Sequence, residues 1–338
     1  MGKAIYVIEH KTTSKDIVPG SPYWQRLTLD DQVSTYLEGA KLLGHTPHGL
    51  LYDVIRKPGE RPALATPVES RKYTKDGALY KTQRDVDESP EDYGARIMEK
   101  ISENPDAYFQ RSIVVRIGDE ARVAAQNAWI YAQQIMAFRK SGNFPQNVDA
   151  CEAWGRFCEF WDVCTNQDTL ENSLKYRKKE ARNTELSSPS PESDDGKRRL
   201  PIISASALRE VRRCPKLYQY KYELGYETTE RSGALHFGTL FHLALEAWWK
   251  SNGSIEAALL ALSVRSDDRG KAIEVDAYDE QKARALMLGY HARWSETKMN
   301  VLAVEKEFSG PLVNPETDGV SRTFERGGKM DAIAEMEF

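Results

Sequence analysis

The sequence predicts an α/β fold in which a mixed central sheet is flanked by helices. Short apolar segments rich in β-branched residues alternate with longer segments of helical periodicity, and turn-forming residues separate them. The composition, 40% hydrophobic and 29% charged, is that of an ordinary globular protein. A chain of 338 residues can bury a core as one large domain or as two small ones.

The first half of the chain is expected to hold three strands and three helices. Runs of Ile, Val, Leu and Tyr indicate the strands, and apolar residues at helical spacing indicate the helices. Thr28 or Asp30 can cap the first helix, and Gly44 follows its end. The strands are expected at 4–10, 50–55 and 112–117, and the helices at 28–43, 90–103 and 119–140. Residues 56–90 are expected to be mainly polar loop.

A charged segment rich in serine and proline, residues 175–199, interrupts this pattern and is expected to be a flexible linker. Its centre, residues 187–196, should be exposed and free of catalytic residues. Helices are expected after it at 204–223, 236–252, 255–264 and 278–298, and strands at 301–308 and 323–337.

The bulk properties exclude some classes of protein and leave others open. The net charge of -4 gives no global basic signature, so any contact with nucleic acid must be local. The sequence shows no apolar run long enough for a membrane helix and no signal-peptide pattern at Met1, which favours a cytoplasmic protein. In a reducing cytoplasm, cysteines more often serve metal binding or catalysis than disulfides.

Glu9 and Lys11 form the first motif that carries chemistry. They lie two residues apart at the end of a predicted strand, so both side chains point to one face. A carboxylate there can hold a divalent cation, and a lysine beside it can orient or deprotonate an attacking water. By themselves the two residues are equally compatible with an exposed ion pair.

Three further patterns are weak alone. Asp331 interrupts an apolar strand, which is costly unless the carboxylate is paired, metal-bound or turned to solvent at a sheet edge. His242 follows Gly238 by one helical turn, and that glycine would permit the close approach of a backbone or ligand. Gln32 and Tyr36 share one helix face. A buried core histidine and an ordinary amphipathic helix are the simpler interpretations.

Taken together, these motifs resemble the RecB-like branch of the PD-(D/E)XK nucleases, which includes lambda-type exonucleases and CRISPR-associated RecB-like nucleases. That branch shows Gly-x-x-x-His on a helix, Gly-x-x-Asp and Glu-x-Lys on strands, and Gln-x-x-x-Tyr on a helix. All four patterns occur here, and the segment from Ser204 through Cys214-Pro215 also resembles the start of that family.

The resemblance implies a restriction-endonuclease-like fold and a DNA nuclease, with exonuclease action favoured. It also implies that His242, Asp331, Glu9 and the main-chain carbonyl of His10 bind Mg²⁺ or Mn²⁺. Lys11 would orient the water, and Gln32 and Tyr36 would support the site. Glu305 precedes the Asp331 strand and could reach the site, although an exposed strand position is the simpler expectation.

The four cysteines fit a further feature of this branch, in which one cysteine near the first helix joins three others to hold a 4Fe–4S cluster. Here Cys214 would join Cys151, Cys158 and Cys164, with gaps of six and five residues inside the trio. A zinc site and four unrelated buried cysteines are the alternatives. Aromatic residues near the trio could shield a cluster from solvent: Trp154, Phe157, Phe160 and Trp161.

The order of the motifs is rotated relative to the family, which implies a circular permutation. Residues 1–174 would be the family's C-terminal half and residues 200–338 its N-terminal half, and together they would form one nuclease domain. The strand at 323–337 should then pair antiparallel with the strand at 4–10, bringing Asp331 beside Glu9. Met1 and Phe338 should lie within about 10 Å of each other, since paired strands are roughly 4.7–4.9 Å apart.

DNA is the expected partner, and a local basic cluster would contact its phosphates: Arg209, Arg212, Arg213 and Lys216. A solvated helix face explains the same residues more simply. Two other functions remain open. One is a catalytically silent protein of the same fold that binds DNA ends or serves as a scaffold, and the other is a zinc-binding interaction module.

Overall fold

The chain folds around one mixed sheet in this computed structural model, which describes residues 3–153, 155–179, 186, 200–229, 233–263 and 275–337. Within these residues the sheet has six strands in the order β3-β2-β1-β10-β7, and β9 also pairs with β10. The strands are β1 (Lys3–Thr13), β2 (Pro47–Arg56), β3 (Phe109–Val114), β7 (Ile202–Ile203), β9 (Met299–Val313) and β10 (Val320–Glu337).

Strand β1 lies between β2, which is parallel to it, and β10, which is antiparallel to it. Val7 and Ile8 are completely buried because the sheet is covered on both faces. Residues from both ends of the chain thus share one sheet. The predicted pairing of the first and last strands is confirmed, with Lys3 opposite Glu337 and Ile8 opposite Ala332.

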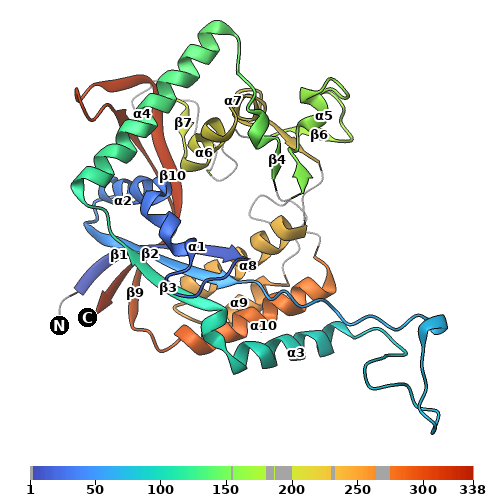
Figure 1. Cartoon of the computed structure of the whole chain (residues 1–338). Helices are drawn as coiled ribbons and strands as arrows, with labels where there is room; N and C mark the ends of the chain where they lie inside the picture. Colours follow the sequence, from blue (N-terminus) through green and yellow to red (C-terminus); the bar gives the residue numbers. More distant parts are fainter. Residues whose placement is uncertain are drawn as a thin grey trace.

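Helices cover both faces of the sheet (Figure 1). Helix α2 (Asp31–Leu42) packs on one face through Val33 and Tyr36. The opposite face is covered by α3 (Pro90–Glu103), α8 (Gly233–Lys250), α9 (Ile255–Ala261) and α10 (Ala277–Trp294). Helices α4 (Gly118–Ser141) and α6 (Ala205–Arg213) pack together near the start of β10.

The described chain also contains shorter α-helices and strands. They are α1 (Pro22–Gln25), α5 (Trp161–Cys164), α7 (Pro215–Tyr218), and the paired short strands β4 (Glu152–Ala153) with β5 (Arg156–Phe157) and β6 (Tyr176–Lys178) with β8 (Tyr226–Thr228). No helix in the described ranges is long and apolar enough to span a bilayer.

The α/β fold class, with its mixed sheet between helices, is confirmed, and two element predictions need correction. The continuous helix expected at 204–223 breaks at Cys214, which is extended with φ −160° because Pro215 disfavours helical geometry in the residue before it. Strand β3 begins at Phe109, three residues before the predicted start. Met1, Phe338 and the linker centre 187–196 lie outside the described residues.

Candidate active site

Glu9, Lys11, Gln32 and Tyr36 form one connected polar group between β1 and α2. The ammonium group of Lys11 contacts Glu9 Oε1 and donates a hydrogen bond to Gln32 Oε1 over 3.0 Å. Gln32 Nε2 in turn donates to Glu9 Oε1 and to the Tyr36 hydroxyl, each over 2.9 Å. The structure therefore joins the Glu-x-Lys and Gln-x-x-x-Tyr motifs through direct contacts.

Local sequence explains how α2 presents these side chains. The Asp30 carboxylate accepts the backbone N–H of Gln32 over 2.9 Å and so caps the helix, which begins at Asp31. Gln32 and Tyr36 then share the buried face of the helix. On β10, a Cβ at Gly328 would lie 3.1 Å from the Tyr36 ring, so a glycine there lets the ring pack closely on the strand.

Asp331 lies beside Glu9 at the β1–β10 pair. The backbone N–H of His10 donates to Asp331 Oδ2 over 2.7 Å. On the other side of β10, Met330 pairs with Lys306 and Ala332 with Val304, which places Glu305 opposite Asp331. Burial and the Asp331 carboxylate raise the pKa of Glu305, although Lys329 opposes them. Glu305 thus lies on an edge strand, as expected, but its side chain is only 20% exposed and lies close enough to Asp331 for the two carboxylates to interact.

His242 lies on α8, close enough to Asp331 for that carboxylate to act on its pKa. Burial lowers the pKa of its imidazole despite the opposing charge of Asp331, which favours the neutral form that metal binding requires. Glu246, one turn along α8, also influences the His242 pKa and was not selected by sequence reasoning. A Cβ at Gly238 would meet only Thr12 Oγ1, at 3.8 Å, so the protein itself makes no close approach there.

The electrostatics of this group suit a cation. Burial raises the pKa of Glu9 to about 8, although Lys11 opposes it. In the described part of the chain, Glu9 Oε2 is buried without a hydrogen-bond partner. A divalent ion near this oxygen would offset the cost of burying the carboxylate.

The side chains are not arranged as a finished metal site. Among the described residues, no three His, Cys, Asp or Glu side chains surround a common point as ligands would. Glu9 is turned toward Lys11 and Gln32, and Asp331 toward the His10 amide. The metal roles of His242, Asp331, Glu9 and the His10 carbonyl therefore stay predictions.

The side chain of His10 joins a buried ionic ladder that the sequence did not reveal. His10, Asp53 and Arg111 occupy matching positions on β1, β2 and β3. His10 Nδ1 lies 3.1 Å from Asp53 Oδ2, and Arg111 Nη2 lies 3.2 Å from the same oxygen. The Tyr290 hydroxyl also donates to Asp53. This ladder anchors the residue between Glu9 and Lys11, and only the strand register could have predicted it.

All four cysteines line one small cavity, together with Phe160, Trp161, Leu217 and Tyr220. The backbone N–H of Cys158 donates to the carbonyl of Cys151 over 2.7 Å. Burial raises the pKa of the Cys151 thiol, and the nearby thiols of Cys214 and Cys164 raise it further. The cysteines therefore converge across the linker, although their sulfurs do not surround one ion in the described structure.

The aromatic shield predicted for these cysteines is only partly present. Phe160 and Trp161 line the cavity, whereas Phe157 is 61% exposed and stacks on Trp161. Trp154 lies outside the described residues.

The four basic residues proposed to contact DNA differ in their surroundings. Arg209 is exposed, and its charge acts on Lys11. Arg212 pairs with Asp31 over 2.8 Å, and the Lys216 ammonium lies 5.3 Å from the centre of the Tyr220 ring. Arg213 acts instead on the thiols of the cysteine cavity. Arg209 is thus the member of this set best placed to meet a substrate at Glu9 and Lys11.

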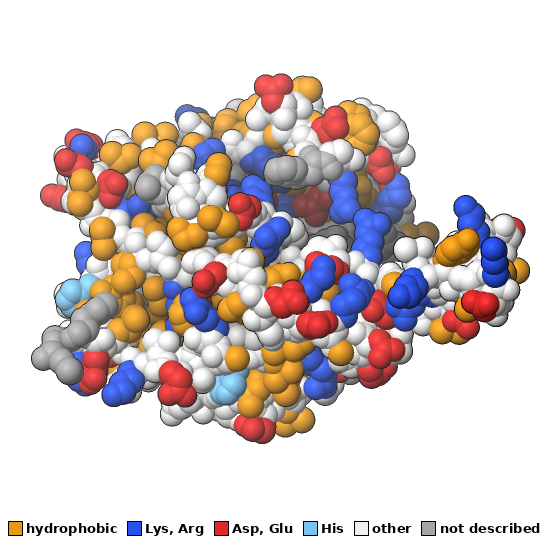
Figure 2. Space-filling model, turned by 60° about the horizontal axis from the view of Figure 1, so that its bottom comes forward, with side chains coloured by type: hydrophobic (Ala, Val, Ile, Leu, Met, Phe, Trp, Pro, Cys, Tyr) orange, Lys and Arg blue, Asp and Glu red, His pale blue; other side chains and the backbone are white. Residues whose placement is uncertain are grey.

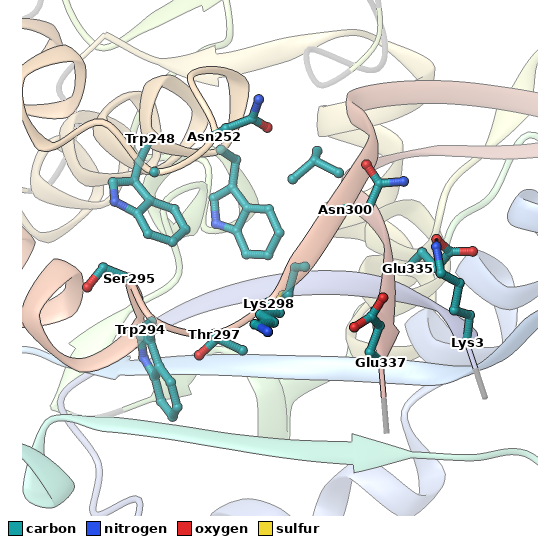
Figure 3. Close-up of a pocket in the computed structure, with 14 residues that line it drawn as sticks. Lys3, Trp248, Asn252, Trp294, Ser295, Thr297, Lys298, Asn300, Glu335 and Glu337 are labelled. Carbon is teal, nitrogen blue, oxygen red and sulfur yellow. Dashed lines mark hydrogen bonds and ion pairs between the residues drawn. The ribbon is translucent and has the colours of Figure 1, made fainter. Parts of the chain in front are cut away.

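A separate cavity of about 460 Å³ lies at the other end of β1 (Figure 3). Trp248, Trp294, Lys3 and Glu337 are among the residues that line it. Because Lys3 begins β1 and Glu9 lies near its far end, this cavity is not part of the candidate active site.

Comparison with known proteins supports one family. The family model of the PD-(D/E)XK nuclease superfamily matches residues 202–336, which include His242, Glu305 and Asp331. Glu9, Lys11, Gln32 and Tyr36 lie outside the matched segment. Searches of curated proteins and of solved structures gave no match. Residues 202–336 are therefore similar to a PD-(D/E)XK nuclease superfamily domain, and the mixed sheet between helices is consistent with the restriction-endonuclease-like fold of that superfamily.

Proposed function

We propose that the chain is a metal-dependent nuclease that hydrolyses DNA phosphodiester bonds, acting as an exonuclease. The observation that carries this proposal is the contact of Lys11 with Glu9 and Gln32, beside the Asp331 strand. Charged groups held this closely in a partly buried site suit the activation of water next to a phosphate. The superfamily match to residues 202–336 supports the same reaction class.

Each side chain has a distinct task in this proposal. Glu9, Asp331 and His242 would hold Mg²⁺ or Mn²⁺, with the His10 carbonyl as a further ligand, and the unpartnered Glu9 Oε2 fits such an ion. The ion would supply a polarised water and offset charge on the phosphate. Lys11, 32% exposed, would orient that water, while Gln32 and Tyr36 hold Glu9 and Lys11 in place. Arg209 would contact a phosphate of the substrate.

The four cysteines would hold a structural 4Fe–4S cluster that fastens the segment 151–164 to Cys214 at the start of α7. Their convergence on one cavity supports this assignment. Cys214 sits where α6 ends and α7 begins, so a cluster there would fix the break between these two helices. A brown protein with absorbance at about 400 nm would support the cluster, by analogy with other Cys-ligated iron–sulfur proteins.

We further propose that the chain is a circular permutation of the family's order, with residues 1–174 and 200–338 as the two halves of one nuclease domain. The antiparallel pairing of β1 with β10 supports this arrangement, because it joins the Glu9 strand to the Asp331 strand as neighbours.

The test of the nuclease is degradation of plasmid DNA with Mn²⁺ or Mg²⁺ and with EDTA. Linear plasmid should be degraded only when the cation is present, and covalently closed circles should survive if the enzyme needs an end. Binding of DNA without cleavage under any of these conditions would instead identify a silent DNA-end-binding protein. A colourless protein that contains zinc and lacks cleavage would identify a zinc-binding module.

A further inference from the structure

Residues 57–88, between β2 and α3, form a long arm that projects away from the body of the molecule (Figure 1). Its tip is a short hairpin with an isolated antiparallel bridge between Tyr73 and Leu79. Sequence reasoning assigned this stretch only as polar loop. Loops this long inside a compact domain are uncommon and usually functional.

The base of the arm is firmly attached. Glu88 is buried at 3% exposure and accepts two hydrogen bonds from Arg96 of α3, over 2.8 and 2.7 Å. The same carboxylate accepts the backbone N–H of Ala63 over 2.8 Å, which ties the outgoing strand of the arm to the returning one. The Tyr278 hydroxyl of α10 donates to the Glu88 carbonyl over 2.7 Å.

The arm is ordered by hydrogen bonds rather than by a core. The backbone N–H of Thr66 donates to the Arg84 carbonyl over 2.9 Å, and that of Thr74 donates to the Ala78 carbonyl over 2.7 Å. Arg71 donates to the carbonyls of Thr66 and Asp85, each over 2.9 Å. Val68, by contrast, is 74% exposed. The arm therefore adds little buried apolar surface to the fold, so its role lies outside stability.

The tip carries a local positive charge in a chain whose net charge is -4. Residues 71–84, from Arg71 through Arg84, include five basic residues and one acidic residue. Lys72, Lys75 and Lys81 are exposed and form no ion pair with other residues of the described ranges. Figure 2 shows Lys and Arg side chains on the projecting arm, among acidic and hydrophobic ones.

Aromatic rings lie among these charges. Tyr73 is 54% exposed and Tyr80 is 49% exposed. The backbone N–H of Tyr80 donates to the Lys72 carbonyl over 3.1 Å, so these two residues lie opposite each other in the hairpin. Because neighbouring residues in a strand face opposite sides, a ring and a lysine are presented together on one side.

The arm starts at the same end of the sheet as the candidate active site. Strand β2 runs parallel to β1, and Lys11 pairs with Val54 only three residues before the arm begins. The backbone N–H of Lys57 donates to the Thr13 carbonyl over 2.7 Å, which fixes the start of the arm next to the end of β1. The start of the arm therefore lies at the same end of the sheet as Glu9 and Lys11.

We propose that the arm is a DNA-binding element that grips the sugar–phosphate backbone of the substrate beyond the cleavage site, with Tyr80 stacking on an unpaired base. This inference rests on the proposed DNA nuclease function. Lysines spaced along an extended segment match the repeating phosphates of a nucleic acid strand. Basic side chains interleaved with exposed rings are the features that bind single-stranded DNA without sequence preference.

The test compares two triple variants in binding to a fluorescent single-stranded oligonucleotide. One replaces Lys72, Lys75 and Lys81 by Gln, and the control replaces the exposed lysines Lys41, Lys140 and Lys178 by Gln. Both are made in the Lys11→Ala background with Ca²⁺, so that cleavage does not interfere.

The arm variant should bind at least about tenfold more weakly, and its salt dependence should fall by a slope of about two, since each lost phosphate contact removes roughly 0.7 for single strands. Both variants should keep the parent melting temperature. Equal affinities, or an equal loss in the control variant, would overturn the proposal.

Two further measurements separate the alternatives. Tyr80→Leu should weaken binding of the single strand by about tenfold and leave a blunt duplex nearly unaffected, because stacking needs an unpaired base. Arm-dependent binding to vesicles with anionic headgroups, without arm-dependent binding to DNA, would show a membrane surface instead and refute the proposal. If the wild-type chain fails to cleave DNA but still binds it through the arm, the nuclease assignment falls while the arm assignment stands.

Discussion

The backbone amide of His10 donates a 2.7 Å hydrogen bond to the Asp331 carboxylate, which is 321 residues away in the sequence. This bond fixes the strand that carries Glu9 and Lys11 against the strand that carries Asp331. It also explains why both strands must be present for the site to exist. The predictions below test the groups that meet around this bond.

Lys11→Ala should reduce DNA cleavage by about 10²–10⁴-fold, the range for loss of a general acid–base group. The lysine contacts Glu9 and Gln32 but is partly exposed, so the protein should remain folded. Initial rates of plasmid degradation and thermal melting measure the two effects. The matched control is Lys41→Ala, at an exposed position near the end of α2. A Lys11→Ala protein as active as the control would refute the mechanism.

Asp53→Asn should destabilise the protein by about 3–5 kcal/mol, because it leaves the Arg111 charge buried without its partner. Tyr290→Phe removes a hydroxyl that donates to the same carboxylate and accepts from Arg111 and Trp249, and it should cost less, about 1–3 kcal/mol, because no buried charge loses its charged partner. Urea unfolding at neutral pH measures both. Equal losses for the two variants would show that the ladder holds no essential charge pair.

Glu88→Gln tests the attachment of the arm through its pH dependence. Hydrogen bonds from Arg96 hold the pKa of Glu88 at about 2, below its ordinary value of 4.5. A lowered carboxylate pKa gives stability that is present above the ordinary value and lost as the pH falls toward the folded value. Wild type should therefore be more stable than Glu88→Gln at pH 7, by about 2 kcal/mol, and the difference should shrink between pH 5 and pH 2.

Melting curves across this pH range measure that difference, and Glu91→Gln, an exposed carboxylate on α3, is the control. A constant gap between Glu88→Gln and wild type at all pH values would contradict the assignment. The variant should also be cut faster by trypsin within the arm, since its base is loosened.

Cys158→Ser should lower the melting temperature before it affects catalysis, because the cysteine cavity is separate from the Lys11 group. Iron, sulfide and zinc contents, with the absorbance near 400 nm, decide which group the cysteines hold. We expect iron and sulfide in the wild-type protein and a lower content of both in the variant. Zinc in their place would identify the alternative site, and a metal-free protein of unchanged stability would exclude both.

Gly39→Ala should destabilise the protein, although this change usually strengthens a helix by up to about 1 kcal/mol. A Cβ at Gly39 would lie 2.6 Å from the Phe308 ring, which is itself packed against Tyr36. Overpacking of this kind costs about 1–3 kcal/mol. Gly118→Ala, where a Cβ would meet nothing within 4 Å, should be nearly neutral in the same denaturation experiment.

Periodicity predicted most helices and strands, and the rotated motif order predicted one strand pairing, but contacts that depend on the other pairings were missed. Helix α3 has the bounds expected, because Ser89 caps it and Pro90 begins it. The pairing of β1 with β10 followed from the rotated motif order. Glu305 was expected on a surface strand, and only the pairing of β9 with β10 shows that it also lies opposite Asp331. The backbone of Glu305, with φ +52°, also departs from regular strand geometry, and no pattern in the sequence predicts this departure.

The periodicity of apolar residues could not predict the arm, for a different reason. Its order comes from single hydrogen bonds between side chains and backbone, such as the Glu88 carboxylate with Ala63. Such contacts leave no repeating pattern of apolar residues, so the sequence indicates only a polar loop. The helix break at Cys214, in contrast, is predictable from Pro215, because proline disfavours helical geometry in the residue before it.

The long sequence separation between His10 and Asp331 also has a consequence for synthesis. Translation proceeds at about 5–20 residues per second, so Asp331 is made roughly 15–65 s after His10. During that interval β1 lacks β10, the strand that completes the candidate site. Contacts between residues so far apart in the sequence form slowly in folding. A ribosome that stalls before β10 would therefore release a chain that lacks Asp331. Under the proposed function, such an incomplete chain would not cleave DNA in the cell.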